Sequence, residues 1–237
     1  MGGGERRERL GRARLLLIFT PELCAADPLE SLEAARPHVD VVQVRPKARG
    51  AGAGPSEARA THDWAERVLD VCASALVPAP PLVMVNDRVD VARALAERGV
   101  DGVHVGDRDT PPGVARELLG NDALIGLSTH DAAQVGAACD EPVDTLGFGP
   151  VFATATKGYG LADTPRDAPR VFGPERAWVV AESSEVPVFP IGGIDLTNVD
   201  QLERVGRAAV GSAVLGAGDP ARAAEAMRAL LAGDSAA

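Results

Sequence analysis

Two acidic residues and an amide follow consecutive apolar stretches of the chain. Asn86 and Asp87 come directly after the apolar run 82–85, and Asp109 follows a second run at 103–105. In a barrel of alternating strands and helices, the carboxyl ends of the strands share one rim, so these side chains are expected to converge. Their oxygen atoms suit Mg²⁺ together with a phosphorylated substrate. The simpler interpretation is an Asn-Asp turn that caps a helix, with Asp109 as an ordinary loop acid.

Three basic residues stand at other expected strand ends. Arg45 and Lys47 follow the apolar run 39–44, and Lys157 follows the run 145–149. Cations beside carboxylates suit a Mg²⁺–diphosphate, because the metal bridges carboxylates to phosphate oxygens and the cations neutralise the remaining charge. Each cation alone would be interpreted as a solvated surface charge. Their combination at successive strand ends favours the diphosphate.

Small residues follow the last two expected strands. Gly192 and Gly193 end the seventh apolar run, and Gly211 and Ser212 end the eighth. Barrels of this kind commonly bind phosphate at these positions, where backbone N–H groups without a nearby Cβ approach the anion. The alternative is that the glycines only make tight turns.

Two histidines are candidates for acid–base chemistry, and neither is assigned a role. His104 lies inside an apolar run and is expected to be a packed, hydrogen-bonded core residue, whereas His130 stands at a helix start. The chain shows no serine–histidine–acid order and no metal-binding histidine spacing.

The elements that position these residues alternate along the chain. The expected strands are 14–20, 39–44, 82–85, 103–105, 123–128, 145–149, 186–191 and 208–212. The expected helices between and after them include 29–36, 56–75, 131–139, 175–182, 198–205 and 220–231. Eight strands alternating with eight helices predict a single (β/α)₈ TIM barrel of the α/β class. A doubly wound open sheet would need a dinucleotide-binding fingerprint after an early strand, and the sequence has none.

The outer limits of the domain follow from composition. Residues 1–12 are rich in arginine and are expected to be a disordered tail, with the barrel domain over 13–237. The glycine-rich segment 49–55 is expected to be mobile, since it offers no apolar side chain to bury.

Charge and cysteine content restrict the partners and the compartment. The net charge of −10 argues against a nucleic-acid partner, which would need a basic face. No apolar stretch is long enough to span a membrane, and the run 15–19 is too short for a signal peptide. The scattered Cys24, Cys72 and Cys139 fit neither a disulfide framework nor a zinc site. We therefore expect a cytoplasmic protein.

Several motifs of the chain together resemble the thiamine-phosphate synthase family. They are Gln43-x-Arg45-x-Lys47, Val85-Asn86-Asp87-Arg88-Val89-Asp90 with Gly102-Val103-His104-Val105-Gly106-x-x-Asp109, Gly126-Leu127-Ser128-Thr129-His130, and Gly149-Pro150-Val151-Phe152-x-Thr154-x-Thr156-Lys157. The glycine-containing Ile191-Gly192-Gly193-Ile194 and Gly211-Ser212-Ala213 extend the resemblance to nearly the whole chain.

The resemblance implies a role for each matched residue. Asp87 and Asp109 would bind Mg²⁺, and Asn86 would contact the pyrimidine substrate. The implied ligands of hydroxymethylpyrimidine diphosphate are Gln43, Arg45, Lys47, Asn86, Ser128 and Lys157, of which Arg45, Lys47, Ser128 and Lys157 would act in catalysis. The implied ligands of hydroxyethylthiazole phosphate are Thr154, Thr156, Gly193, Gly211 and Ser212.

The implied reaction joins the two phosphorylated precursors and releases pyrophosphate. Such a substitution needs positioning and electrostatic stabilisation more than a general base. The implied partners are small phosphorylated molecules, and assembly into a homo-oligomer stays open.

Two alternatives remain within the same fold. One is a thiazole tautomerase-like barrel, which tends to carry histidine at the position of Pro150 and to lack the Asn-Asp pair and the later Asp, all three of which this chain keeps. The other is a barrel that binds a thiamine precursor without turnover. It is motivated by Pro46, where the family usually has an acid, and by Gly211, where it has a bulkier apolar residue.

Overall fold

The computed structural model describes residues 1–47, 55–73, 79–154 and 170–233 of the 237-residue chain. Within these residues, eight parallel strands form one sheet in the order β7-β6-β5-β4-β3-β2-β1-β8, and a bridge between Ile191 and Ala209 closes it. The strands are β1 (Leu15–Phe19), β2 (Val41–Val44), β3 (Leu82–Asn86), β4 (Gly102–Val105), β5 (Leu124–Thr129), β6 (Thr145–Phe148), β7 (Val188–Pro190) and β8 (Ala208–Val210). The predicted TIM barrel is confirmed.

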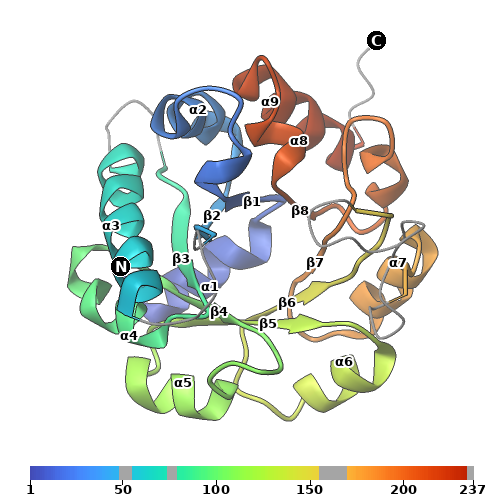
Figure 1. Ribbon diagram of the computed structural model, residues 1–237. Helices are drawn as coiled ribbons and strands as arrows, with labels where there is room; N and C mark the ends of the chain where they lie inside the picture. Colours follow the sequence, from blue (N-terminus) through green and yellow to red (C-terminus); the bar gives the residue numbers. More distant parts are fainter. Residues whose placement is uncertain (48–54, 74–78, 155–169, 234–237) are drawn as a thin grey trace.

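Helices surround the strands on the outside (Figure 1). The α-helices are α1 (Gly3–Arg12), α2 (Pro28–Ala35), α3 (Pro55–Cys72), α4 (Val89–Ala94), α5 (Pro112–Leu119), α6 (Ala132–Ala138), α7 (Pro174–Ser183), α8 (Ser212–Leu215) and α9 (Pro220–Leu231). Short 3₁₀ turns are η1 (Pro21–Leu23), η2 (Arg36–His38), η3 (Ala96–Arg98) and η4 (Val199–Leu202). None of the described helices has the length and apolar character needed to cross a membrane.

Helix starts follow their capping residues. The Asp27 side chain accepts the backbone N–H groups of Leu29 and Glu30 at the start of α2, and the Asp219 side chain accepts that of Arg222 at the start of α9. In both helices a proline follows the cap, where its missing N–H costs nothing. The helix expected at 198–205 is wrong, because the chain there makes only the 3₁₀ turn η4 before the left-handed Gly206.

The strands bury side chains on both faces. In β1, Leu15, Leu17 and Phe19 belong to the layer between strands and helices, whereas Leu16 belongs to a second cluster inside the barrel. This alternation is the period of two expected of a strand. The inner cluster also contains Leu82, Met84, Leu124 and Phe189. The barrel interior below the strand ends is therefore a packed apolar core.

The expectation that residues 1–12 form a disordered tail is wrong. They contain helix α1, which is seen through the ring of strands in Figure 1. Leu10 is 1% exposed and joins the inner cluster, so α1 packs across the N-terminal end of the barrel. Arg6 and Arg7 bind carboxylates of Asp101 and Asp144, at 2.7 and 2.6 Å. These carboxylates stand directly before β4 and β6 and are distant in sequence.

Candidate active site

A cavity of about 360 Å³ opens among the carboxyl ends of the strands. Its floor is apolar and includes Leu16 and Phe189 from inside the barrel. Its polar lining includes most of the residues singled out from the sequence, namely Gln43, Arg45, Asn86, Ser128, Thr154, Gly193, Gly211 and Ser212. Thr156 and Lys157 lie outside the described residues. An apolar pocket with a few convergent polar groups is the usual form of a small-molecule site.

A chain of hydrogen bonds fixes the polar groups at the end of β3. The Gln43 Nε2 donates to Asn86 Oδ1 at 2.6 Å, and Asn86 Nδ2 donates to Asp87 Oδ2 at 2.6 Å. Gln43 is buried on β2, which pairs with β3 in parallel register. Because the Asn86 oxygen accepts from one neighbour and its nitrogen donates to the other, the orientation of the Asn86 amide is determined by these two bonds.

Asp87 occupies an uncommon backbone conformation. Its φ of 61° is in the left-handed region, and it is the non-glycine residue with positive φ in the described part of the chain. The Asp87 N–H donates to the carbonyl of His104 at 2.8 Å, which anchors the turn to β4. Such strain persists where surrounding contacts impose it and is frequent at functional sites. The simpler interpretation of Asp87 as a helix cap is not what the structure shows, because α4 begins without a side-chain cap.

Asp109 lies on an exposed turn after β4. Its Oδ2 accepts the N–H of Gly106 at 2.9 Å, which holds the carboxylate close to the end of the strand. Asp107, two residues earlier, faces the exposed Arg108 at 3.9 Å. Asp87 and Asp109 thus follow neighbouring strands. Asn86 and His104 on these two strands line the cavity, whereas neither carboxylate is among its lining residues.

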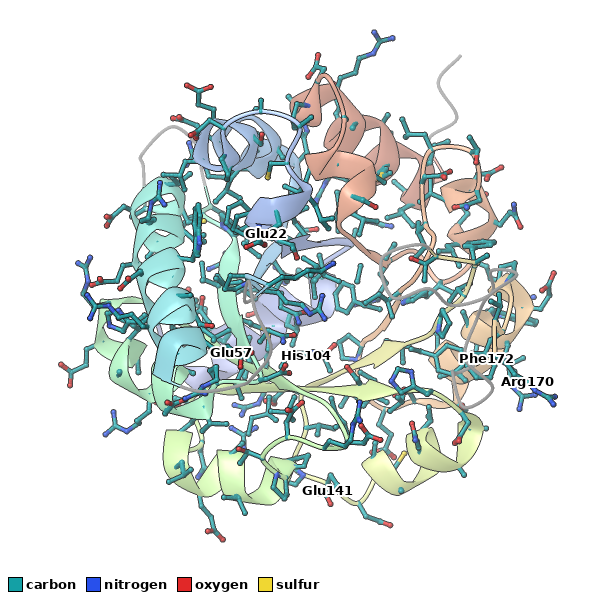
Figure 2. The ribbon with its side chains drawn as sticks, viewed as in Figure 1. Glu22, Glu57, His104, Glu141, Arg170 and Phe172 are labelled. Carbon is teal, nitrogen blue, oxygen red and sulfur yellow. The ribbon has the colours of Figure 1, made fainter. Side chains whose placement is uncertain are left out.

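The cations near the cavity differ in their surroundings. Arg45 continues the pairing of β2, with its N–H donating to the Phe19 carbonyl at 2.8 Å, and its side chain lines the cavity. Lys47 is exposed, and its N–H donates to the Glu22 carboxylate at 3.1 Å. Glu22, labelled in Figure 2, was not singled out from the sequence, since it lies on η1 and meets Lys47 only in the folded chain.

The cation that follows Asp87 is already engaged. The Arg88 guanidinium pairs with the Asp90 carboxylate at 2.5 Å. This hydrogen bond lowers the pKa of Asp90 and raises the pKa of Arg88 from their ordinary values. Arg88 is therefore a partner of Asp90 in the α4 turn rather than a cation of the cavity.

His104 is buried and hydrogen-bonded, as expected from the sequence, and it also lines the cavity, which the sequence did not indicate. Its Nε2 lies 2.9 Å from Ser128 Oγ, and the side chain lines the cavity among the strands (Figure 2). A Cβ at Gly126 would lie 2.3 Å from its Nδ1, and one at Gly147 3.3 Å from its Cε1. The available signal was the pair of glycines in β5 and β6, which leave room for a ring.

The glycines after β7 are required by both conformation and packing. Gly192 and Gly193 have φ values of 100° and 64°. A Cβ at Gly193 would lie 2.2 Å from the Ala153 carbonyl oxygen. The close approach pairs this turn with the segment after β6, since the Phe152 N–H donates to the Gly192 carbonyl at 3.0 Å. The turn and Thr154 therefore meet on one side of the cavity.

A closed (β/α)₈ barrel with a polar cavity at the carboxyl ends of its strands has the architecture of a barrel enzyme. Residues 15–215 match the model of the family described as thiamine monophosphate synthase. The chain belongs to the thiamine monophosphate synthase family.

Relatives and solved structures agree with this assignment. Thiamine-phosphate synthase of Gloeobacter violaceus is 40% identical over 93% of this chain, which spans only 58% of the length of that relative. Thiamine-phosphate synthase of Anaeromyxobacter dehalogenans is 40% identical over 94% of this chain and 89% of its own length. The structure of a thiamine phosphate pyrophosphorylase from Pyrococcus furiosus superposes with a TM-score of 0.73 at 29% identity, covering 95% of this chain and 97% of that one.

Proposed function

We propose that this chain is a transferase of thiamine biosynthesis that joins hydroxymethylpyrimidine diphosphate to hydroxyethylthiazole phosphate. Family membership and the named relatives support the reaction. The observation that carries it is the meeting of Gln43, Asn86 and Ser128 in one cavity beside Asp87. In the reaction, the thiazole nitrogen bonds to the pyrimidine methylene carbon. The carbon–oxygen bond to the diphosphate breaks, and its electron pair leaves with pyrophosphate.

The diphosphate end of the site is assigned to cations and a hydroxyl. Arg45 and Ser128 line the cavity, and Lys47 follows Arg45 by two residues. Together with Lys157, they neutralise charge that develops on the leaving pyrophosphate, which is the contribution expected of donors placed before the reaction begins. Gln43 and Asn86, already joined by a hydrogen bond, hold the polar edge of the pyrimidine.

The residues present fit a Mg²⁺ ion. Asp87 and Asp109 supply hard carboxylate oxygens after neighbouring strands. The described residues contain no group of three or more histidine, cysteine, aspartate or glutamate side chains that could hold a metal alone. Mg²⁺ binds through one or two carboxylates plus substrate phosphates, and the two aspartates supply that number. When bound, the ion supplies Lewis-acid stabilisation of the phosphate oxygens.

The thiazole phosphate is assigned to the opposite side of the cavity. Thr154, Gly193, Gly211 and Ser212 line that side, and Thr156 completes the proposed set. The left-handed turn at Gly193 lets backbone groups approach an anion closely. The proposed partners are thus small phosphorylated molecules. A cytoplasmic location and assembly into a homo-oligomer remain predictions.

Turnover with both precursors tests the proposal. Purified protein is supplied with the two phosphorylated precursors and Mg²⁺, and thiamine phosphate and pyrophosphate are measured together. Equal amounts of both products are expected, with the rate lost on chelation of Mg²⁺. Tight precursor binding without product would indicate the non-catalytic barrel, and isomerisation of the thiazole alone would indicate the tautomerase-like alternative.

A further inference from the structure

The imidazole of His104 is built into the wall of the cavity. His104 on β4 pairs in register with Gly126 on β5, and its Nε2 reaches Ser128 two residues further along β5. The ring occupies the volume that a side chain at 126 would need, and its far edge lies against Gly147 on β6. At 8% exposure, His104 has little freedom to turn away from Ser128. The geometry therefore fixes which atom faces the serine hydroxyl.

The direction of this hydrogen bond decides what Ser128 can do. A serine hydroxyl has one proton and two lone pairs. If the hydroxyl donates to a bare Nε2, only its lone pairs face the cavity, and these repel a phosphate oxygen. If Nε2–H donates to Oγ instead, the hydroxyl proton is available for an anion.

We propose that His104 is a positioning residue whose Nε2–H donates to Ser128 Oγ and directs the Ser128 hydroxyl proton toward the diphosphate. The inference rests on the proposed role of Ser128 as a diphosphate ligand. His104 also supports the turn after β3, because its backbone carbonyl accepts the Asp87 N–H. His104 thus links the turn that carries Asp87 with the hydroxyl on the neighbouring strand.

A cycle of variants tests the coupling. His104→Leu removes the donor, His104→Gln keeps an N–H donor near the position of Nε2, and Ser128→Ala removes the hydroxyl. We measure kcat and KM with both precursors, together with binding of inorganic pyrophosphate in the presence of Mg²⁺. Thermal unfolding shows that each variant is folded.

The expected pattern is a shared loss. Ser128→Ala and His104→Leu should each lower kcat/KM by about 10- to 100-fold, as for a lost hydrogen bond to a charged group. The double variant should lose less than about threefold more than either single variant, since both remove the same interaction. His104→Gln should stay within about tenfold of the parent, and pyrophosphate binding should follow the same order.

Several outcomes would overturn the inference. Losses that multiply in the double variant, or a His104→Gln variant as weak as His104→Leu, would show that His104 does not act through Ser128. If Ser128→Ala matches the parent in both assays, the proposed role of Ser128 fails as well.

The tautomer gives a readout that does not depend on turnover. The chain contains four histidines, so the ¹⁵N signals of the His104 ring can be assigned by their loss in His104→Gln. A protonated Nε2 in the free parent protein is expected. A bare Nε2 would overturn the inference even if the protein proves to be an active synthase, and a protonated Nε2 would support it even if the parent turns out to be inactive.

Discussion

The Asp101 carboxylate binds Arg6 with one oxygen and the backbone N–H of Val83 with the other, at 2.7 and 2.9 Å. It joins the first helix to the starts of two strands. Two other aspartates bind the start of a strand in the same way around the N-terminal end of the barrel. Asp40 accepts the N–H of Leu15 at 3.0 Å, and Asp144 accepts that of Ile125 at 2.8 Å.

Each of these carboxylates precedes an even-numbered strand and binds the start of the odd-numbered strand before it. Each also pairs with arginine: Asp40 with Arg228, Asp101 with Arg6, and Asp144 with Arg7 and Arg116. These carboxylates fix the register between neighbouring strands at the end of the barrel opposite to the cavity. Substitutions there should change the stability of the fold without changing the residues of the cavity.

Replacing Asp101 should destabilise the fold. Asp101→Ala leaves the Val83 N–H and the Arg6 guanidinium without this partner in a buried position, which should cost about 3 kcal/mol of unfolding free energy. Denaturant titration measures the change. Asp63→Ala is the control, since the Asp63 pair with Arg59 is exposed and should be worth less than about 0.5 kcal/mol. Equal stabilities would contradict a structural role for Asp101.

The first helix should contribute stability through Leu10. Leu10→Ala removes a side chain that is 1% exposed in the inner cluster, and should lower the unfolding free energy by about 2 kcal/mol or more. Arg12→Ala is the matched control on the same helix, because the Arg12 side chain is 79% exposed and pairs with the exposed Glu8. A melting temperature unchanged by Leu10→Ala would mean that α1 is detached in solution.

Asp87→Asn should remove turnover and keep the fold. Asparagine tolerates the left-handed φ of this position as well as aspartate does, so the turn survives. Loss of the carboxylate should lower the Mg²⁺-dependent rate by about 100-fold or more, because charge on the leaving pyrophosphate is then less well stabilised. Rates are measured against Mg²⁺ concentration.

Asp107→Asn is the control for the metal, since the Asp107 side chain faces Arg108. It should have far less effect than Asp87→Asn or Asp109→Asn. Turnover of Asp87→Asn at the parental rate, or a dependence on Asp107 in place of Asp109, would require a different set of metal ligands.

Gly193→Ala should damage the thiazole side. The substitution places a Cβ where the φ is 64° and the Ala153 oxygen would be 2.2 Å away. We expect a raised KM for the thiazole phosphate, with a smaller effect on the pyrimidine substrate, and a stability loss of about 1–3 kcal/mol. Gly136→Ala is the control, because a Cβ there meets nothing within 4 Å and helix α6 should tolerate it. Equal KM values for both variants would contradict this placement.

The cysteines should react in the order of their exposure. Cys139 is exposed, whereas burial raises the pKa of the Cys72 thiol to about 12. At pH 8 only roughly one Cys72 in ten thousand would be thiolate, so a thiol reagent should modify Cys139 first and Cys72 only at the rate of unfolding. Mass spectrometry of peptides after timed labelling measures both. Rapid labelling of Cys72 in folded protein would contradict its burial.

Local sequence patterns predicted most of the barrel because each strand carries its own apolar run. The stretch that ends in Asn86 and Asp87 is an example, and its position at the rim follows from the fold alone. The role of α1 could not be predicted, since Arg6 and Arg7 find their partners 95 and 137 residues away. A run of arginines is typical of a solvated tail, and only the folded barrel brings those carboxylates beside it.

In the candidate site too, features within one segment could be predicted, and contacts between distant segments could not. Arg45, Asn86 and Ser128 could be placed because each ends a strand. The bond between His104 and Ser128 could not, because it depends on the register of β4 against β5 and on a glycine that makes room. Segment 49–55 is outside the described residues except for Pro55, as are Thr156 and Lys157, so those predictions stand as made.

Helix α1 has a consequence for how molecules reach the cavity. Leu10 and the inner cluster fill the N-terminal end of the barrel. The cavity is therefore closed at its floor and is reached from the carboxyl ends of the strands. Molecules that enter by one mouth must also leave by it, in the reverse order of their depth. Of two molecules bound at once, the one against the floor of Leu16 and Phe189 must therefore arrive first.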